Sequence, residues 1–265
     1  MKFGVLSTPP SLGELRRFLG LQSVDLPLQR PYVWTTSVTS IDGRTSTQEP
    51  DAEGGHAIAT AGGKYNGLVD RKILEHGWKT ADAILTTGEI LRSEPTVTYR
   101  PSGARRKPLC IILTASGMID LDHPVFRRNR TLTVTTKEGL RRLKGFRKSA
   151  GRDMIVSDSN ESKISLTWLL SYLRKEKNVL FLDVNAGGRT ISDFLSHGLV
   201  DEMRISLVGT ILGRWSSQGQ ERSCLIDNPT ETCYDLRNLP LLSFNEIRTT
   251  TDASHVFLRL RTSGS

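Results

Sequence analysis

The chain is poor in the features that mark secreted, membrane-spanning and metal-binding proteins. Its 265 residues include only three cysteines, an odd number without metal-like pairing, and this usage fits a reducing compartment. No apolar run is long enough to span a membrane, and residues 1–20 lack the apolar core of a secretory signal. We therefore expect a cytoplasmic protein with no membrane association and no metal site.

Acidic residues are outnumbered by basic ones, 28 against 36, and the net charge is +8. The basic residues cluster at 105–107, 127–130 and 141–148. A nucleic-acid-binding protein would use such patches. Here they are not interleaved with aromatic residues, and no nucleic-acid signature is present. We favour a solvated helix and loop surface; attraction of phosphorylated small molecules is a second interpretation, and no nucleic-acid partner is expected.

Strand-like and helix-like segments alternate along the chain, which is typical of an α/β fold with a mainly parallel sheet. Strands are expected at 32–38, 83–85, 109–113, 132–135, 154–156, 179–184 and 203–208. Helices are expected at 64–77 with Gly77 as the stop, at 137–148, and after the cap Ser165. A C-terminal antiparallel hairpin is expected from Leu241 to Leu260, and a mobile loop over a site at 46–63.

The first thirty residues have the character of an extension with one short helix. Ser11 and Glu14 have the spacing of a capping box, and the apolar positions that follow form one stripe before Gly20. We expect this helix to pack on the body of the protein or on a partner subunit. The predicted domains are 1–30 as this extension and 31–262 as the main domain.

Residues 180–213 are the most informative segment. An apolar strand ends in Asn185-Ala186-Gly187-Gly188, an amphipathic helix follows, and a second strand begins near Met203. Glycines at a strand end let backbone N–H groups approach a ligand, and the following helix N-terminus favours an anion. The spacing differs from the usual dinucleotide fingerprint. A tight turn that needs positive φ is an equally good interpretation of the glycines alone.

Three segments in order resemble the reductase domain of riboflavin biosynthesis. The first runs from Arg30-Pro31-Tyr32-Val33 to Ser40-Ile41-Asp42-Gly43-Arg44, the second from Ala81 to Gly88 and from Glu94 to Arg100, and the third is residues 180–213. This resemblance implies a dihydrofolate-reductase-like fold, in which helices flank a mainly parallel sheet with an antiparallel end. It also implies NADPH as cofactor and a homodimer.

In this family, a hydride from NADPH reduces the ribosylamino side chain of a pyrimidine 5′-phosphate to ribitylamino. The resemblance implies that the cofactor contacts Ser40, Thr86, Thr87, Gly88, Thr114, Ser116, Ala186, Gly187, Gly188, Arg189 and Thr190. It implies that the phosphorylated substrate contacts Thr36, Thr98 and Arg100. Arg100 matches the arginine that grips the substrate phosphate, a role that suits a planar guanidinium. The alternative for Arg100 is an ordinary exposed loop residue.

The catalytic candidates are Asp42, Asn185 and Asp183. Asn185 stands where the family has a glutamate, and an amide cannot exchange a proton at neutral pH. Asp183 faces the same side of the strand and is either a substitute carboxylate or one satisfied by backbone donors. Asp42 is either a catalytic carboxylate or a turn former. Glu89 replaces a threonine and would repel cofactor phosphates unless it points outward.

The leading hypothesis is an NADPH-dependent reductase of the riboflavin-pathway type. The departures at Asn185 and at Ala186, which replaces a glycine, motivate two alternatives. One is a reductase of the same fold that acts on another small molecule, and the other is a catalytically silent homologue that binds a nucleotide.

Overall fold

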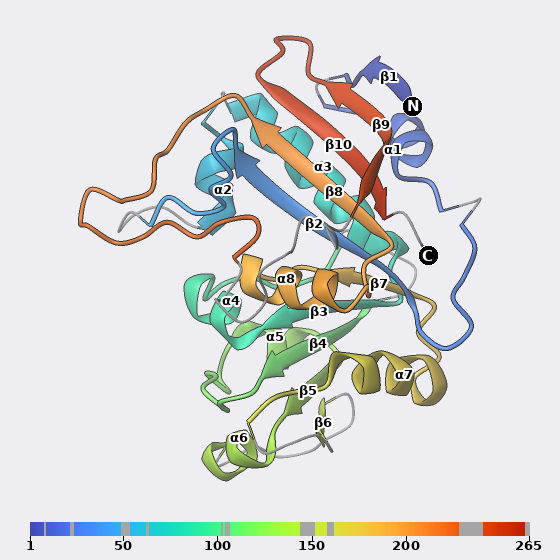
Figure 1. Ribbon diagram of the computed structural model, residues 1–265, viewed down its shortest axis with the longest axis vertical. Helices are drawn as coiled ribbons and strands as arrows, with labels where there is room; N and C mark the ends of the chain where they lie inside the picture. Colours follow the sequence, from blue (N-terminus) through green and yellow to red (C-terminus); the bar gives the residue numbers. More distant parts are fainter. Residues whose placement is uncertain are drawn as a thin grey trace. The chain divides into compact units, whose positions relative to one another are not determined.

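The computed structural model describes residues 1–7, 9–21, 24–48, 54–61, 64–101, 103, 107–143, 152–157, 162–227 and 241–262. The chain divides into two compact units (Figure 1). The first unit comprises Met1–Asp25, Trp34–Gly77 and Gly187–Ser265, and the second comprises Leu26–Val33 and Trp78–Ala186. Among the described residues, no helix combines the length and apolar character that crossing a bilayer requires.

The second unit contains five parallel strands in the order β7-β3-β4-β5-β6. They are β3 (Ala83–Thr87), β4 (Leu109–Thr114), β5 (Thr131–Thr135), β6 (Arg152–Val156) and β7 (Phe181–Val184). Every residue of β3 and β5 is buried, as expected for parallel strands covered on both faces. Because the strands are parallel, their carboxyl ends lie along one edge of the sheet.

Short capped helices connect these strands. They are α4 (Gly88–Ser93), α5 (Pro124–Arg128), α6 (Lys137–Arg142) and α7 (Leu166–Glu176). The caps are Thr87, His123, Thr136 and Ser165, and the side chain of each accepts a hydrogen bond from a backbone N–H in the first turn. Each cap satisfies a donor that has no partner within its helix.

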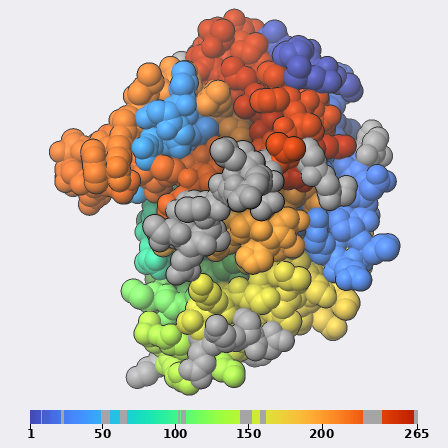
Figure 2. Space-filling view, viewed as in Figure 1, coloured from blue at the N-terminus to red at the C-terminus, as the bar shows by residue number. Residues whose placement is uncertain are grey.

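The first unit contains strands in the order β1-β9-β10-β8-β2. They are β1 (Lys2–Val5), β9 (Leu242–Thr249), β10 (His255–Thr262), β8 (Glu202–Val208) and β2 (Tyr32–Ser40), whose first two residues belong to the second unit. β10 is antiparallel to β8 and β9, whereas β1 pairs with β9 and β2 with β8 in parallel. In Figure 2 the red atoms of the C-terminal hairpin accordingly lie beside the dark blue atoms of the first residues.

Four helices complete this unit or begin in it: α1 (Leu12–Leu19), α2 (Gly54–Ala59), α3 (Lys64–Thr80) and α8 (Gly188–Ser196). α1 and α3 pack their apolar faces together with β10. The cluster is fully buried and consists of Leu6, Leu15, Phe18, Leu19, Val69, Ile73 and Phe257. α1 is thus part of the core of the first unit, which agrees with its predicted packing on the body of the protein.

The expected α/β fold with a mainly parallel sheet and a C-terminal antiparallel hairpin is confirmed. Three expectations were wrong in detail. Gly77 does not end its helix, because α3 continues to Thr80 and buries Trp78. The predicted loop at 46–63 contains α2. The helix predicted at 137–148 ends at Arg142, and residues 144–148 lie outside the described part, as do 105 and 106. The domain limits at 30 and 262 stay a prediction.

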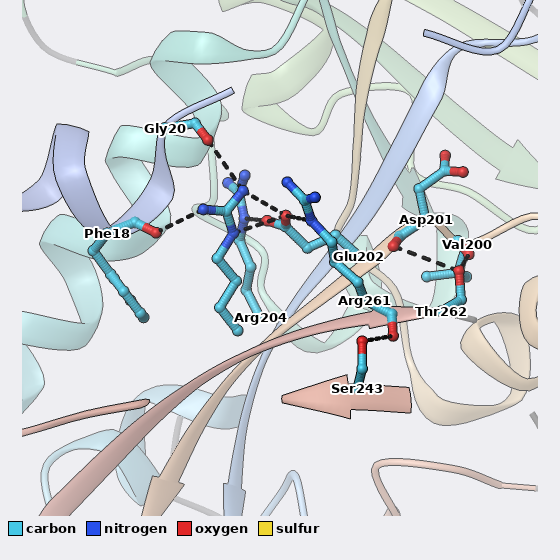
Figure 3. A network of polar contacts seen from close by, with 10 residues as sticks. Phe18, Gly20, Val200, Asp201, Glu202, Arg204, Ser243, Arg261 and Thr262 are labelled. Carbon is cyan, nitrogen blue, oxygen red and sulfur yellow. Dashed lines mark hydrogen bonds and ion pairs between the residues drawn. The ribbon is translucent and has the colours of Figure 1, made fainter. Parts of the chain in front are cut away.

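A buried ionic network joins α1 to the sheet of the first unit (Figure 3). Glu202 Oε1 accepts from Arg204 Nε at 2.7 Å, and Glu202 Oε2 accepts from Arg259 Nε at 2.8 Å. Arg259 also donates to the carbonyl oxygens of Phe18 at 3.1 Å and Gly20 at 3.0 Å, at the end of α1. Burial acts to raise the pKa of Glu202, but the two guanidinium groups outweigh it and lower that pKa.

The capping box at α1 carries a pH-dependent share of stability. Glu14 accepts hydrogen bonds from the side chains and backbone N–H groups of Ser7 and Ser11, and these lower its pKa from 4.5 to about 2. Glu14→Gln is expected to cost about 0.5 kcal/mol at neutral pH. Because the pKa is lower in the folded state, this difference is present above pH 4.5 and disappears as the pH falls toward 2. Urea unfolding of wild type and Glu14→Gln at several pH values measures this difference in the free energy of unfolding. A difference that does not change with pH would contradict the role of the Glu14 carboxylate.

Candidate active site

Small polar residues gather at the carboxyl edge of the second unit's sheet. β3 ends at Thr87, β4 at Thr114, and Asn185 directly follows β7. The pairing Leu85↔Val184 places the ends of β3 and β7 side by side. Ligands of open α/β sheets bind at this edge. Several predicted site residues of this unit end a strand or directly follow one. They therefore lie along the same edge of the sheet.

Asn185 has a hydrogen-bonded environment that fixes its side chain. Trp78 Nε1 donates to Asn185 Oδ1 at 3.1 Å, and Asn185 Nδ2 donates to Asp183 Oδ1 at 2.7 Å. The backbone N–H of Asn185 donates to the carbonyl of Leu85 at 2.8 Å. Asp183 is fully buried, whereas Asn185 is half-buried. Burial prevents Asp183 from touching a ligand directly, so it can act only through its neighbours.

Tyr99 anchors the segment that carries Thr98 and Arg100. Its hydroxyl shares a hydrogen bond with Thr86 Oγ1 at 2.8 Å, and its ring meets Trp78 edge to face at 5.2 Å. Burial raises the pKa of Tyr99 well above its usual value, so the hydroxyl stays neutral. Arg100, the residue after the buried Tyr99, is exposed. Arg100 is thus free for a solvent-borne anion, although the alternative of a plain surface arginine stays open.

Trp78 and Tyr99 are the residues of this edge that sequence reasoning missed. Trp78 follows Gly77, where the helix was expected to stop, and so it was not placed near Asn185. Tyr99 lies between two predicted substrate residues. Its aromatic ring in an otherwise polar loop was a signal for burial.

The residues at the start of α4 have structural roles that the sequence did not reveal. Thr87 Oγ1 accepts from the Ile90 N–H at 3.3 Å and caps the helix. A Cβ on Gly88 would lie 2.7 Å from Ile119 Cγ2 and 3.3 Å from the Met118 carbonyl oxygen, so packing alone requires a glycine. Glu89 is exposed in the first turn, where a carboxylate favours the helix dipole.

Thr114 and Ser116 differ in whether their side chains are exposed to a ligand. Thr114 is buried, and its carbonyl oxygen accepts from Thr135 Oγ1 at 2.7 Å. Ser116 is exposed, and its Oγ accepts from the Met118 N–H at 3.3 Å. Ser116 therefore keeps a hydroxyl hydrogen that it can donate to a phosphate.

The glycine turn continues into α8 in the first unit. Gly187 is the N-cap with φ −70°, and no side chain caps the helix. Neither Gly187 nor Gly188 has positive φ, so the interpretation as a positive-φ turn was wrong. A Cβ on Gly188 would lie 2.1 Å from the Cys224 carbonyl oxygen, whereas one on Gly187 would meet nothing within 4 Å. The missing side chain of Gly188 lets the backbone at Cys224 approach, and within the described residues no side chain caps the first N–H groups of α8.

The remaining residues predicted in the turn are more open. Ala186 and Thr190 are half-buried. The Arg189 side chain is 69% exposed and lies 3.6 Å from the carboxylate of Asp227, a weak surface pair that a stronger anion can displace. Arg189 can therefore turn toward a phosphate at little cost.

Asp42 organises its own turn in the first unit. Its carboxylate accepts from Ser40 Oγ at 2.7 Å and from the N–H groups of Leu212 at 3.1 Å and Gly213 at 2.7 Å. Burial acts to raise the pKa of Asp42, but these hydrogen bonds together lower it. Gly43 follows with φ +80°. The contacts favour the turn-former interpretation of Asp42, and they use the Ser40 hydroxyl within the turn.

The predicted site residues fall into two groups. Thr36, Ser40, Asp42 and 187–190 belong to the first unit, and Thr86, Thr87, Gly88, Thr98, Arg100, Thr114, Ser116, Asp183, Asn185 and Ala186 belong to the second. Thr36 lies on β2, half-buried and paired with Arg204. Which of these residues contact a ligand stays a prediction.

The parallel strands of the second unit, with polar residues at their carboxyl ends, place it in the class of open α/β sheets, whose ligands bind at this edge. Residues 31–237 match the model of the RibD C-terminal domain, and the chain belongs to this family.

Two curated relatives agree with this membership. A 2,5-diamino-6-ribosylamino-4(3H)-pyrimidinone 5′-phosphate reductase of Archaeoglobus fulgidus is 27% identical over 191 residues, which are 66% of this chain and 79% of the relative. The riboflavin biosynthesis protein RibD of Aquifex aeolicus is 24% identical over 195 residues, 72% of this chain but only 50% of that protein.

Solved structures share the fold. A pyrimidine reductase-like protein of Corynebacterium diphtheriae superposes with a TM-score of 0.67 at 17% identity, covering 95% of this chain and 99% of that one. The riboflavin biosynthesis reductase Rib7 of Saccharomyces cerevisiae gives 0.63 at 17% identity over 94% and 99%. RibD of Acinetobacter baumannii gives 0.66 at 18% identity, and the chain spans 59% of its length.

Proposed function

We propose that this chain is a reductase of the riboflavin pathway that converts the ribosylamino side chain of a pyrimidine 5′-phosphate to ribitylamino with NADPH. Membership of the RibD C-terminal domain family and the name of the Archaeoglobus relative support the reaction. The geometric observation that carries the proposal is the start of α8, where a glycine N-cap leaves the first N–H groups without a side-chain acceptor.

The start of α8 fits the diphosphate of a dinucleotide. A phosphate there would accept from the N–H groups of the first turn, which no described side chain caps, and would gain from the helix dipole; Arg189 would add a charge-assisted bond. In the second unit, Thr114 ends β4 and Ser116 follows it, and the exposed hydroxyl of Ser116 suits the adenosine phosphate of NADPH. When bound, the nicotinamide supplies the hydride; the protein residues bind and orient.

The substrate phosphate is assigned to Arg100, with Thr98 beside it. Arg100 carries an exposed guanidinium on a segment that the buried Tyr99 holds, and it can bind a phosphate with two parallel hydrogen bonds. Arg100→Ala is expected to raise the KM for the phosphorylated substrate by about 10- to 100-fold, because a hydrogen bond to a charged group is lost. Steady-state kinetics measure this.

Two controls sharpen the Arg100 test. Arg128→Ala removes another exposed arginine from a basic cluster and is expected to leave KM unchanged. The dephosphorylated substrate is expected to bind wild type and Arg100→Ala alike. An unchanged KM in Arg100→Ala, or an equal rise in Arg128→Ala, would rule out the phosphate assignment.

The reaction itself is tested with the purified chain, the ribosylamino-pyrimidine 5′-phosphate and NADPH. Loss of the nicotinamide absorbance, with a product heavier by two hydrogen atoms, is the expected result; NADH in parallel measures cofactor preference. We also propose that the protein is cytoplasmic and forms a homodimer, as in the family. Analytical ultracentrifugation tests the dimer. NADPH binding without turnover would favour the alternatives that Asn185 motivates, a divergent reductase or a silent nucleotide-binding homologue.

A further inference from the structure

The side-chain amide of Asn185 is held in one orientation by two partners of opposite character. The indole N–H of Trp78 can only donate, so the atom it meets at 3.1 Å is the amide oxygen. The carboxylate of Asp183 accepts, so the atom that meets it at 2.7 Å is the amide nitrogen. Exchanging oxygen and nitrogen would break both bonds. Trp78 is 1% exposed and Asp183 is 0% exposed, so neither partner is free to move away.

This arrangement fixes where the amide nitrogen of Asn185 lies and leaves it an N–H donor for a further partner. Its nitrogen carries two hydrogens, of which Asp183 takes one, and within the described part of the chain no acceptor is recorded for the other. Trp78 takes one of the two lone pairs of the amide oxygen. The half-buried Asn185 at the carboxyl edge of the sheet therefore presents an N–H donor, whereas a glutamate there would present acceptors.

We propose that Asp183 and Trp78 are positioning residues that orient Asn185 so that its free N–H donates to an oxygen of the substrate's ribosyl chain. This inference rests on the proposed function. It assigns the family's glutamate position in this chain to sugar recognition and leaves proton exchange to solvent, because an amide has no titratable proton at neutral pH. A glutamate at 185 would put a second carboxylate beside a buried one, so Asn185 and Asp183 form a matched pair.

The test is a set of variants whose affinity for the ribosylamino-pyrimidine 5′-phosphate is measured by calorimetry and whose melting temperature is recorded. Asn185→Ala is expected to weaken binding by about three- to tenfold, the loss of one hydrogen bond. Asp183→Ala and Trp78→Phe are expected to weaken binding by a similar factor. The double variant Asn185→Ala/Asp183→Ala is expected to weaken binding no more than Asn185→Ala alone, because Asp183 acts through the Asn185 amide. Asp183→Asn keeps a carbonyl acceptor and is expected to recover most of the affinity.

Asp82 supplies a matched control. Its carboxylate lies at the opposite, amino end of β3 and accepts from the N–H groups of Leu180 at 2.9 Å and Phe181 at 3.0 Å. Asp82→Ala is expected to lower the melting temperature without changing substrate affinity. Additive losses in the double variant, or an Asp183→Asn variant as weak as Asp183→Ala, would overturn the positioning role.

A second readout separates this inference from the proposed function. The side-chain amide resonances of Asn185, identified by their loss in Asn185→Ala, are expected to shift in Asp183→Ala and Trp78→Phe but not in Asp82→Ala. Unshifted resonances would overturn the positioning even in an active enzyme. If wild type neither binds nor reduces the substrate, the proposed function and the sugar contact fall, while the resonance shifts still decide whether Asp183 and Trp78 orient Asn185.

Discussion

Replacing Glu202 by glutamine is expected to lower the free energy of unfolding by about 3–5 kcal/mol, because it leaves buried cations without their counter-charge. Glu202 is 0% exposed and Arg204 and Arg259 are 2% and 4% exposed, so water cannot take the place of the carboxylate. The Arg204 guanidinium lies 4.3 Å from the Trp34 ring centroid, a contact that cannot compensate for a lost carboxylate.

Chemical denaturation of wild type and Glu202→Gln measures this loss, and hydrogen exchange at β8 and β10 locates it. Glu75→Gln is the matched control, since Glu75 pairs with Arg71 at 2.8 Å on the surface and its loss is expected to cost less than about 1 kcal/mol. Equal losses in the two variants would show that the Glu202 network does not hold the first unit together.

The second large effect is expected from Gly188→Ala. The new Cβ would lie 2.1 Å from the Cys224 carbonyl oxygen and 2.9 Å from the Asp227 N–H nitrogen, which are backbone atoms that no side-chain rotation can remove. Overpacking of this kind costs about 1–3 kcal/mol. The shift also displaces the start of α8, so NADPH affinity is expected to fall by more than about tenfold if its N–H groups bind the diphosphate.

Gly187→Ala is the natural control because an added methyl group there meets nothing within 4 Å and φ is −70°. It is expected to change stability by less than about 0.5 kcal/mol. Thermal melts with and without NADPH compare the two variants. A Gly188→Ala protein that keeps both its stability and the cofactor-induced rise in melting temperature would disprove the close approach and the assignment of α8 together.

Local patterns in the sequence were sufficient for much of the fold. Short apolar runs predicted the strands, and their alternation with helices predicted a mainly parallel sheet. The Ser11–Glu14 spacing predicted a capping box that forms as expected. β1 was not predicted, because Phe3 and Val5 are exposed and the strand forms only by pairing with β9, far along the chain. No local rule reveals such a partner.

In the candidate site, too, local features could be predicted from the sequence and long-range contacts could not. The strand ends and the glycine turn were predicted from the chain's own order, and the family resemblance supplied the ligand roles. The contacts of Asn185 with Trp78 and of Glu202 with Arg259 join residues 107 and 57 positions apart, so spacing could not reveal them. The position of Asp183 in the sequence is compatible with a replacement carboxylate, and only its complete burial shows that it must act through a neighbour.

The hydrogen bonds from Arg259 to Phe18 and Gly20 span 241 and 239 positions of the chain. When the ribosome has translated β7, every strand from β3 to β7 of the second unit has been synthesised, while Phe257 and Arg259, the β10 residues that contact α1, have not. During translation, α1 can pack against Val69 and Ile73 of α3, but its burial is completed only when Phe257 and Arg259 of β10 emerge. Slow elongation after residue 184 would prolong that interval and give chaperones a defined segment to protect.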